Sequence, residues 1–113
     1  MNNDPARLAD QVALAGEKVR KAAADLEVAT STGNVDDQIA AALKLRAALE
    51  EQKSASDALR KLIGEEARKK EVESTLKEID PLLVEIDNAL ASLYEKKNVE
   101  AAKQTLQKAA RQV

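Results

Sequence analysis

The sequence predicts an all-α protein: an up-and-down, antiparallel helical bundle with three long helices and a shorter C-terminal fourth helix. Small and aliphatic residues recur at alternating spacings of four and three through most of the chain, as on the buried side of a packed helix. Asn, Asp, Gly or Pro, which begin and end helices, bound these segments. We expect helices at residues 5–31, 35–63, 66–96 and 99–113, in one domain spanning residues 1–113.

The first predicted helix begins at Asp4 and Pro5, which match a capping residue followed by proline in the first helical position. The segment TSTGN ends it with a glycine and a new capping residue. Its predicted buried stripe comprises Leu8, Val12, Ala15, Val19, Ala22, Leu26 and Ala29.

The second predicted helix begins at Asn34 and carries Asp36 and Asp37 in its first turn, where the helix dipole favours anions. Gly64 marks the turn that follows it. Gln52 is the polar break in its stripe, and we interpret it as a helix-edge residue or as a polar group that sets the register. The predicted stripe comprises Ala41, Leu45, Ala48, Gln52, Ala55, Leu59 and Leu62.

The third predicted helix contains Pro81, which removes a backbone donor and clashes with the carbonyl of Lys77. At about 100° per residue, position 81 lies about 200° from both Ile79 and Leu83, opposite the apolar stripe. Because the stripe keeps its phase, we expect a bent continuous helix rather than a break capped by Asp80. The predicted stripe comprises Val72, Leu76, Ile79, Leu83, Ile86, Leu90 and Leu93.

The fourth predicted helix is short and opens at Asn98. Its stripe is still running at the last residue, which suggests either a boundary within a longer helix or a frayed terminus. The predicted stripe comprises Val99, Ala102, Leu106, Ala109 and Val113.

The chain has no His and no Cys, so it lacks the commonest acid/base group, the reactive thiol and the best transition-metal ligands. Glu78, Asp80, Glu85 and Asp87 form an acidic run, but helical spacing spreads them over solvated faces. The glycines are isolated and form no phosphate-binding loop. We therefore expect no enzyme activity and no catalytic, cofactor or metal site.

Charge balance and hydropathy restrict the kinds of molecule that the chain is expected to bind. With 18 basic and 20 acidic residues, the chain has no nucleic-acid footprint, although residues 96–113 form a modestly basic segment. It has no apolar run of membrane-spanning length, and its start, MNNDPARLADQ, lacks a signal-peptide core. We expect a soluble, unprocessed protein, with the cytoplasm as the default location, that binds another protein; self-association is left open.

Apolar residues outside the stripes are the only positive indication of a binding surface. They are Leu14, Val28, Leu43, Leu82 and Val84. Leu82 and Val84 adjoin Pro81, so a cluster there favours a helix-face contact, and we take both as candidate partner-binding residues. Tyr94 is interpreted as a packing lid with a solvated hydroxyl.

The segment VESTLKEIDPLLVEID, residues 72–87, resembles the second helix of a BAG domain through the following residues: Val72, Thr75, Leu76, Leu83, Glu85, Ile86 and Asp87. BAG domains are three-helix co-chaperone modules that bind the ATPase domain of heat-shock chaperones. In that family an acidic residue here and an arginine on the following helix contact the chaperone. The resemblance gives Asp87 the first role and places Lys103 where the arginine is expected.

The opening hairpin, GEKVRK followed by VDDQIAAALKLRAAL, is similar to the WHEP hairpin appended to some aminoacyl-tRNA synthetases. The basic turn of that family is replaced here by DLEVATSTG, so RNA binding is not expected to accompany the resemblance.

These observations predict a non-enzymatic interaction or scaffold module that presents a helix face to another protein. The alternatives are a BAG-like co-chaperone, a designed or idealised bundle without an evolved ligand, a WHEP-like appended module, and a reversible lipid-surface binder.

Overall fold

The computed structural model describes residues 5–62 and 66–113, and every regular element in that part of the chain is an α-helix. The predicted all-α fold is therefore confirmed, and the helix limits differ from the predicted ones by no more than two residues. The predicted turn at Gly64 lies outside the described residues. The helices are α1 (Pro5–Thr32), α2 (Val35–Leu62), α3 (Glu66–Glu95) and α4 (Val99–Arg111).

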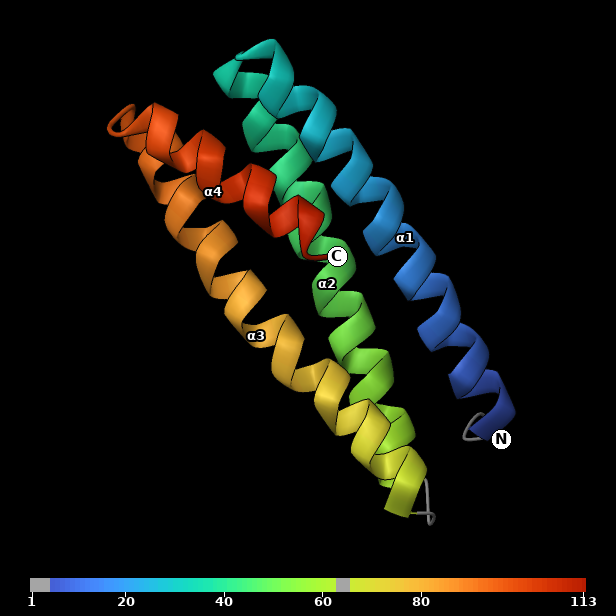
Figure 1. The fold of residues 1–113 in the computed structure, drawn as a ribbon. Helices are drawn as coiled ribbons and strands as arrows, with labels where there is room; N and C mark the ends of the chain where they lie inside the picture. Colours follow the sequence, from blue (N-terminus) through green and yellow to red (C-terminus); the bar gives the residue numbers. More distant parts are fainter. Residues whose placement is uncertain (1–4, 63–65) are drawn as a thin grey trace.

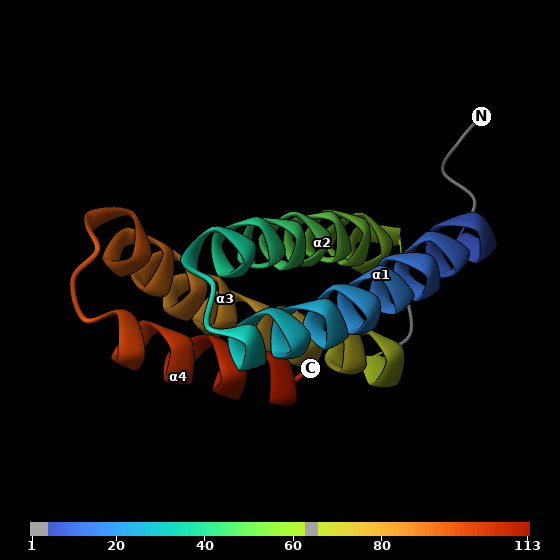
Figure 2. The same ribbon diagram turned by 90° about the horizontal axis from the view of Figure 1, so that it is seen from above.

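The helices run alternately up and down, and each packs against the next (Figure 1). The fourth helix returns to the first, so α4 contacts both α3 and α1, whereas the backbones of α1 and α3 do not approach each other closely within the described ranges. Since α4 has only 13 residues, against 28 to 30 in the other helices, it covers one end of the bundle. It crosses obliquely from the end of α3 towards α1 (Figures 1 and 2).

The core consists of aliphatic side chains, as the sequence predicts. Every helix contributes at least one fully buried large side chain, and alanines fill the remaining positions and let the helices approach closely. The large core residues include Leu26, Leu45, Ile86, Leu93 and Leu106. On α1 and on the C-terminal half of α3, most residues of the predicted stripes are buried, and a few residues beside the stripes are buried with them, namely Ala23, Thr30, Leu82 and Ala89.

The predicted stripe of α2 is incomplete. A second row, formed by Gln38, Ala42, Leu49 and Ser56, is buried beside it, whereas Leu62 at the end of the predicted stripe is 40% exposed. The reason is that α2 has α1 on one side and α3 on the other, and therefore buries a wider face than a single stripe. Within the described chain, neither amide atom of Gln38 has a hydrogen-bond partner.

Pro81 lies inside a continuous α3, as predicted. It is exposed, whereas Ile79, two residues earlier, is buried. The proline ring is therefore on the outer side of the helix, where water can solvate the carbonyl of Lys77 that lacks its usual donor.

The turn between α1 and α2 has residues suited to it. Gly33 adopts a left-handed conformation with φ of 75°, which glycine tolerates because it lacks a Cβ. The side-chain oxygen of Asn34 accepts a hydrogen bond of 3.1 Å from the amide of Asp37, which confirms Asn34 as the cap of α2.

The turn between α3 and α4 is built differently. The amides of Lys96 and Lys97 donate to the carbonyls of Leu93 and Ser92, which closes α3 with the paired hydrogen bonds of a Schellman motif. Lys96, with φ of 57°, holds the left-handed position that usually belongs to glycine. Asn98 also has a positive φ, of 52°, and its side chain makes no capping hydrogen bond.

None of the helices, as far as they are described, combines the length and apolar character needed to cross a membrane.

Candidate partner-binding face on α2 and α3

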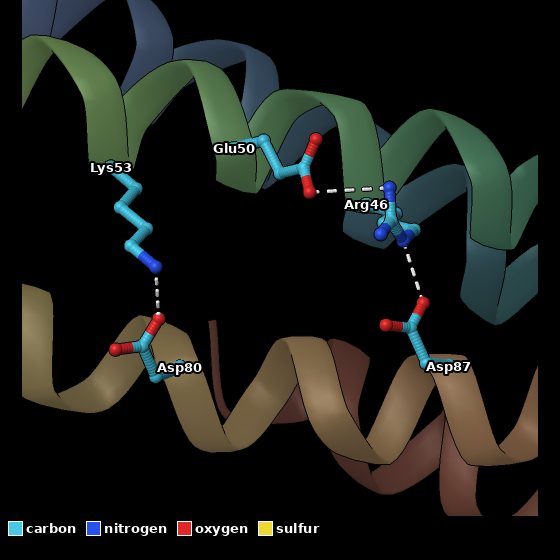
Figure 3. Close-up of polar contacts among 5 residues, drawn as sticks. All are labelled: Arg46, Glu50, Lys53, Asp80 and Asp87. Carbon is cyan, nitrogen blue, oxygen red and sulfur yellow. Dashed lines mark hydrogen bonds and ion pairs between the residues drawn. The ribbon is translucent and has the colours of Figure 1, made fainter.

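Among the described residues, two ion pairs connect α2 to α3. Arg46 Nε lies 2.6 Å from Asp87 Oδ1, and Lys53 Nζ lies 2.6 Å from Asp80 Oδ1 (Figure 3). Arg46 also contacts Glu50, one turn along α2, at 3.2 Å. On each helix the paired residues are seven apart, or two helical turns, so both pairs lie along one side of an antiparallel interface.

These contacts favour the charged form of each base. The hydrogen bond to Asp87, followed by the Coulomb attraction of Asp87 and Glu50, raises the pKa of Arg46. The hydrogen bond and charge of Asp80 likewise raise the pKa of Lys53. Because all these side chains are substantially exposed, solvent screens the pairs and they contribute little to stability. Their matched seven-residue spacing is consistent with one register of α3 against α2.

Exposed apolar side chains lie around the Arg46–Asp87 pair. Leu43, one turn before Arg46, is 44% exposed, and Val84, one turn before Asp87, is 59% exposed. Tyr94, two turns after Asp87, is 60% exposed. Because α2 and α3 are antiparallel, Leu43 lies at the level of α3 between Asp87 and Tyr94. We call this surface, formed by Leu43, Arg46, Val84, Asp87 and Tyr94, the α2–α3 face.

A groove runs along the boundary between α2 and α3 and leads away from this face. Half-buried leucines of α3 form its apolar part, and charged side chains of both helices form its rim. The residues that carry this pattern are Lys53, Asp57, Arg60, Leu76, Asp80 and Leu83. This arrangement can accept an apolar side chain while pairing charges at its edges.

Of the predicted partner-binding residues, Leu82 is misassigned. It is only 7% exposed and belongs to the core, where it borders a cavity of 130 Å³ with Val19, Leu49 and Val113. The physical reason is that α4 and α1 close over a second row of α3 that a single stripe does not include. Val84, in contrast, is exposed as expected.

Asp87 and Lys103, which the BAG resemblance associates, are not brought together. Asp87 is paired with α2, whereas α4 packs on the side of α3 that carries Glu85 and Ala89. At about 100° per residue, positions 85 and 87 lie about 200° apart. Lys103 is likewise about 200° around α4 from Ala101, which faces α3. The two side chains therefore belong to different faces of the bundle.

Two other assignments change. Tyr94 leaves most of its ring exposed and so does not act as a packing lid. The buried polar residues Gln38 and Ser56 were not predicted, although a signal for them exists. A second row of α2 has the same alternation of four and three residues as the predicted stripe, and it comprises positions 38, 42, 45, 49, 52, 56 and 59.

The chemistry of the α2–α3 face is that of recognition. Its guanidinium and carboxylate groups pair with one another, as do Lys53 and Asp80 in the adjoining groove, and they can exchange these partners for charges on another molecule. Across residues 5–62 and 66–113, no group of three or more acidic side chains is arranged to hold a metal ion.

Comparison with known proteins gives no relative: no family model, no curated protein and no solved structure matches the chain. The short resemblances to the BAG and WHEP families are thus not accompanied by a family match.

Proposed function

We propose that this chain is a non-enzymatic interaction or scaffold module, working in the cytoplasm, that presents the α2–α3 face to another protein. The observation that supports this proposal is the position of Leu43, Val84 and Tyr94 beside a row of ion pairs on one side of the bundle. Apolar anchors with a polar surround are the usual composition of a protein interface, and tyrosine and arginine are enriched at its centre.

The spacing of the face favours a helical partner. Val84, Asp87, Ala91 and Tyr94 are exposed at successive turns of α3, the separation at which the side chains of a second helix interdigitate. A partner helix with an apolar stripe and one flanking charge of each sign fits this surface, because it can contact Val84 and Tyr94 while pairing with Asp87 and Arg46.

Site-specific photo-crosslinking can identify the partner. A photoreactive residue in place of Val84 is compared with one in place of Val28, a valine of α1 that is 64% exposed. We expect one protein to be captured from position 84 and not from position 28. Equal capture from both positions, or none from position 84, contradicts the proposal.

The captured protein is then purified and titrated with the chain. A charged side chain introduced at the centre of an interface typically weakens binding tenfold or more. A tenfold change in Kd corresponds to ~1.4 kcal/mol. We expect Val84→Glu to raise Kd by at least about tenfold and Val28→Glu to leave it within about twofold. An equal effect of both variants argues against the α2–α3 face.

The same titration with a heat-shock chaperone ATPase domain tests the BAG-like alternative. That alternative requires nucleotide-sensitive binding that Asp87→Ala abolishes. In this structure Asp87 is engaged by Arg46, so chaperone binding has to break that pair. Binding that depends on Asp87 and not on Val84 replaces our proposal with the BAG-like function.

A further inference from the structure

The attachment of α4 to the bundle is slight compared with that of the other helices. Its fully buried side chains are one leucine, Leu106, and three alanines, Ala102, Ala109 and Ala110. The ion pair between Arg111 Nε and Glu27 Oε1, at 3.1 Å, joins it to α1, and both side chains are largely exposed. Removing α4 therefore uncovers little apolar surface and breaks a solvent-screened ion pair.

The turn that brings α4 back onto the bundle is short and strained. Only three residues separate α3 from α4, and two of them, Lys96 and Asn98, have left-handed backbones. A lysine in this conformation brings its Cβ close to the following carbonyl oxygen, a conflict that glycine avoids. Asn98 tolerates the left-handed region better, but its side chain supplies no cap to α4. The closed turn thus carries strain that opening would release.

From these observations we propose that α4 is exchanged between two copies of this chain. In the resulting dimer, each α4 leaves its own bundle and occupies on the second copy the seat that it occupies here. This seat is the surface of α1 and α3 that includes Glu27, Glu85 and Ala89.

The second copy is the occupant that the seat fits, because the exchange re-forms the contacts of α4 with α1 and α3, including the pair between Arg111 and Glu27. The two states differ at the turn: opening gives up the hydrogen bonds of the Lys96 and Lys97 amides and releases the strain at Lys96 and Asn98. Short strained hinge loops favour this kind of exchange. The exchange therefore becomes favourable when the chain is concentrated enough to offset the loss of free rotation and translation.

This inference does not depend on the proposed function. The seat lies on the side of α3 that carries Glu85 and Ala89, about 200° around the helix from Asp87 on the α2–α3 face. A chain that binds its partner through the α2–α3 face without exchanging α4, or the reverse, separates the two proposals.

Light scattering coupled to gel filtration, from low micromolar to the highest soluble concentration, measures the dimer. Lys96→Gly is compared with Lys97→Gly, the same substitution one residue later, where the backbone φ is not positive. Both glycines lower helix propensity equally, so only the strain differs. We expect the dimer Kd of Lys96→Gly to exceed that of Lys97→Gly by at least about tenfold. Equal Kd values, or a monomer at every concentration, overturn the proposal.

Crosslinking then shows which chain supplies the helix. The chain has no cysteine, so Glu27→Cys and Arg111→Cys in one variant introduce the only two thiols. Side chains that meet at their charged ends are too far apart at Cβ for a disulfide between the two introduced cysteines. A short bismaleimide is therefore used to connect the two thiols. In the dimer fraction we expect crosslinks between chains, which run as a dimer on a denaturing gel. Crosslinks within single chains indicate a side-by-side dimer and overturn the exchange of α4.

Discussion

The two turns described at residue level reverse the chain in similar ways but with different residues. After α1, the left-handed position belongs to Gly33, and Asn34 caps α2 through its side chain. After α3, the corresponding position belongs to Lys96, and Asn98 is left-handed without a side-chain cap. The first turn is favoured by its own sequence, whereas the second is maintained by the packing of α4 against α1 and α3.

The two ends of the chain are therefore not held equally. The hairpin of α1 and α2 combines two long helices with a compatible turn, and so we expect it to be the stable part of the fold. Helix α4 combines a short length, small buried side chains and a strained turn, so we expect it to open first.

The largest effects are expected from truncating the fully buried leucines Leu45 and Leu106. Each is 0% exposed, and replacement with alanine typically costs about 2–5 kcal/mol. We expect Leu45→Ala to lower the free energy of unfolding of the whole bundle, measured by urea denaturation. We expect Leu106→Ala to release α4 alone, so that its amides exchange hydrogen rapidly while those of α1 and α2 stay protected. A uniform loss of protection in Leu106→Ala contradicts the contrast.

Gly33→Ala tests the compatible turn. A Cβ at Gly33 meets nothing within 4 Å, so the cost comes from the left-handed backbone and we expect a loss of about 1–2 kcal/mol. Gly16→Ala is the control: this glycine lies in the middle of α1, and a Cβ there lies 3.5 Å from Gln52 Nε2, an ordinary contact. Since alanine favours a helix interior by up to about 1 kcal/mol, the control is expected to stabilise the chain. Effects of the same sign in urea denaturation argue against backbone strain.

Lys96→Gly tests the strained turn, where introducing a glycine is expected to stabilise the chain. Relief of the left-handed lysine is expected to raise the free energy of unfolding of the monomer by about 1 kcal/mol, measured at low concentration. Lys97→Gly is expected to bring no gain, because its φ is not positive. If both variants are equally stable, Lys96 carries no strain and the contrast between the turns disappears.

The smallest effect is expected from Lys53→Met, which removes the ion pair with Asp80 in the groove beside the α2–α3 face. Because the pKa of Lys53 is raised by folding, the contribution of the pair is fully present below the ordinary lysine value of 10.5 and is lost as pH rises through the higher folded value. Wild type and variant should therefore converge in stability only in strongly alkaline solution. A difference that vanishes already near pH 9 refutes this assignment.

The helices and their limits were predictable because their signals are local. The spacing of apolar residues, the cap at Asn34, the start of α1 at Pro5 and the exposed position of Pro81 each depend on a few neighbouring residues. The candidate site was predictable only in part: Val84 is exposed as expected, whereas Leu82, two residues earlier, is buried. The sequence pattern around a leucine outside the stripe is the same whether or not another helix covers that leucine.

The helical content, the order and limits of the helices, and the lack of imidazole and thiol chemistry follow from residue types and short-range spacing alone. Three features follow from packing instead: the second buried row of α2 with Gln38, the pair between Arg46 and Asp87 across 41 residues of chain, and the position of Lys103 on a different face from Asp87. The physical reason is that the buried width of a helix depends on how many neighbours flank it. A stripe of alanine and leucine is compatible with several such arrangements until the helices pack.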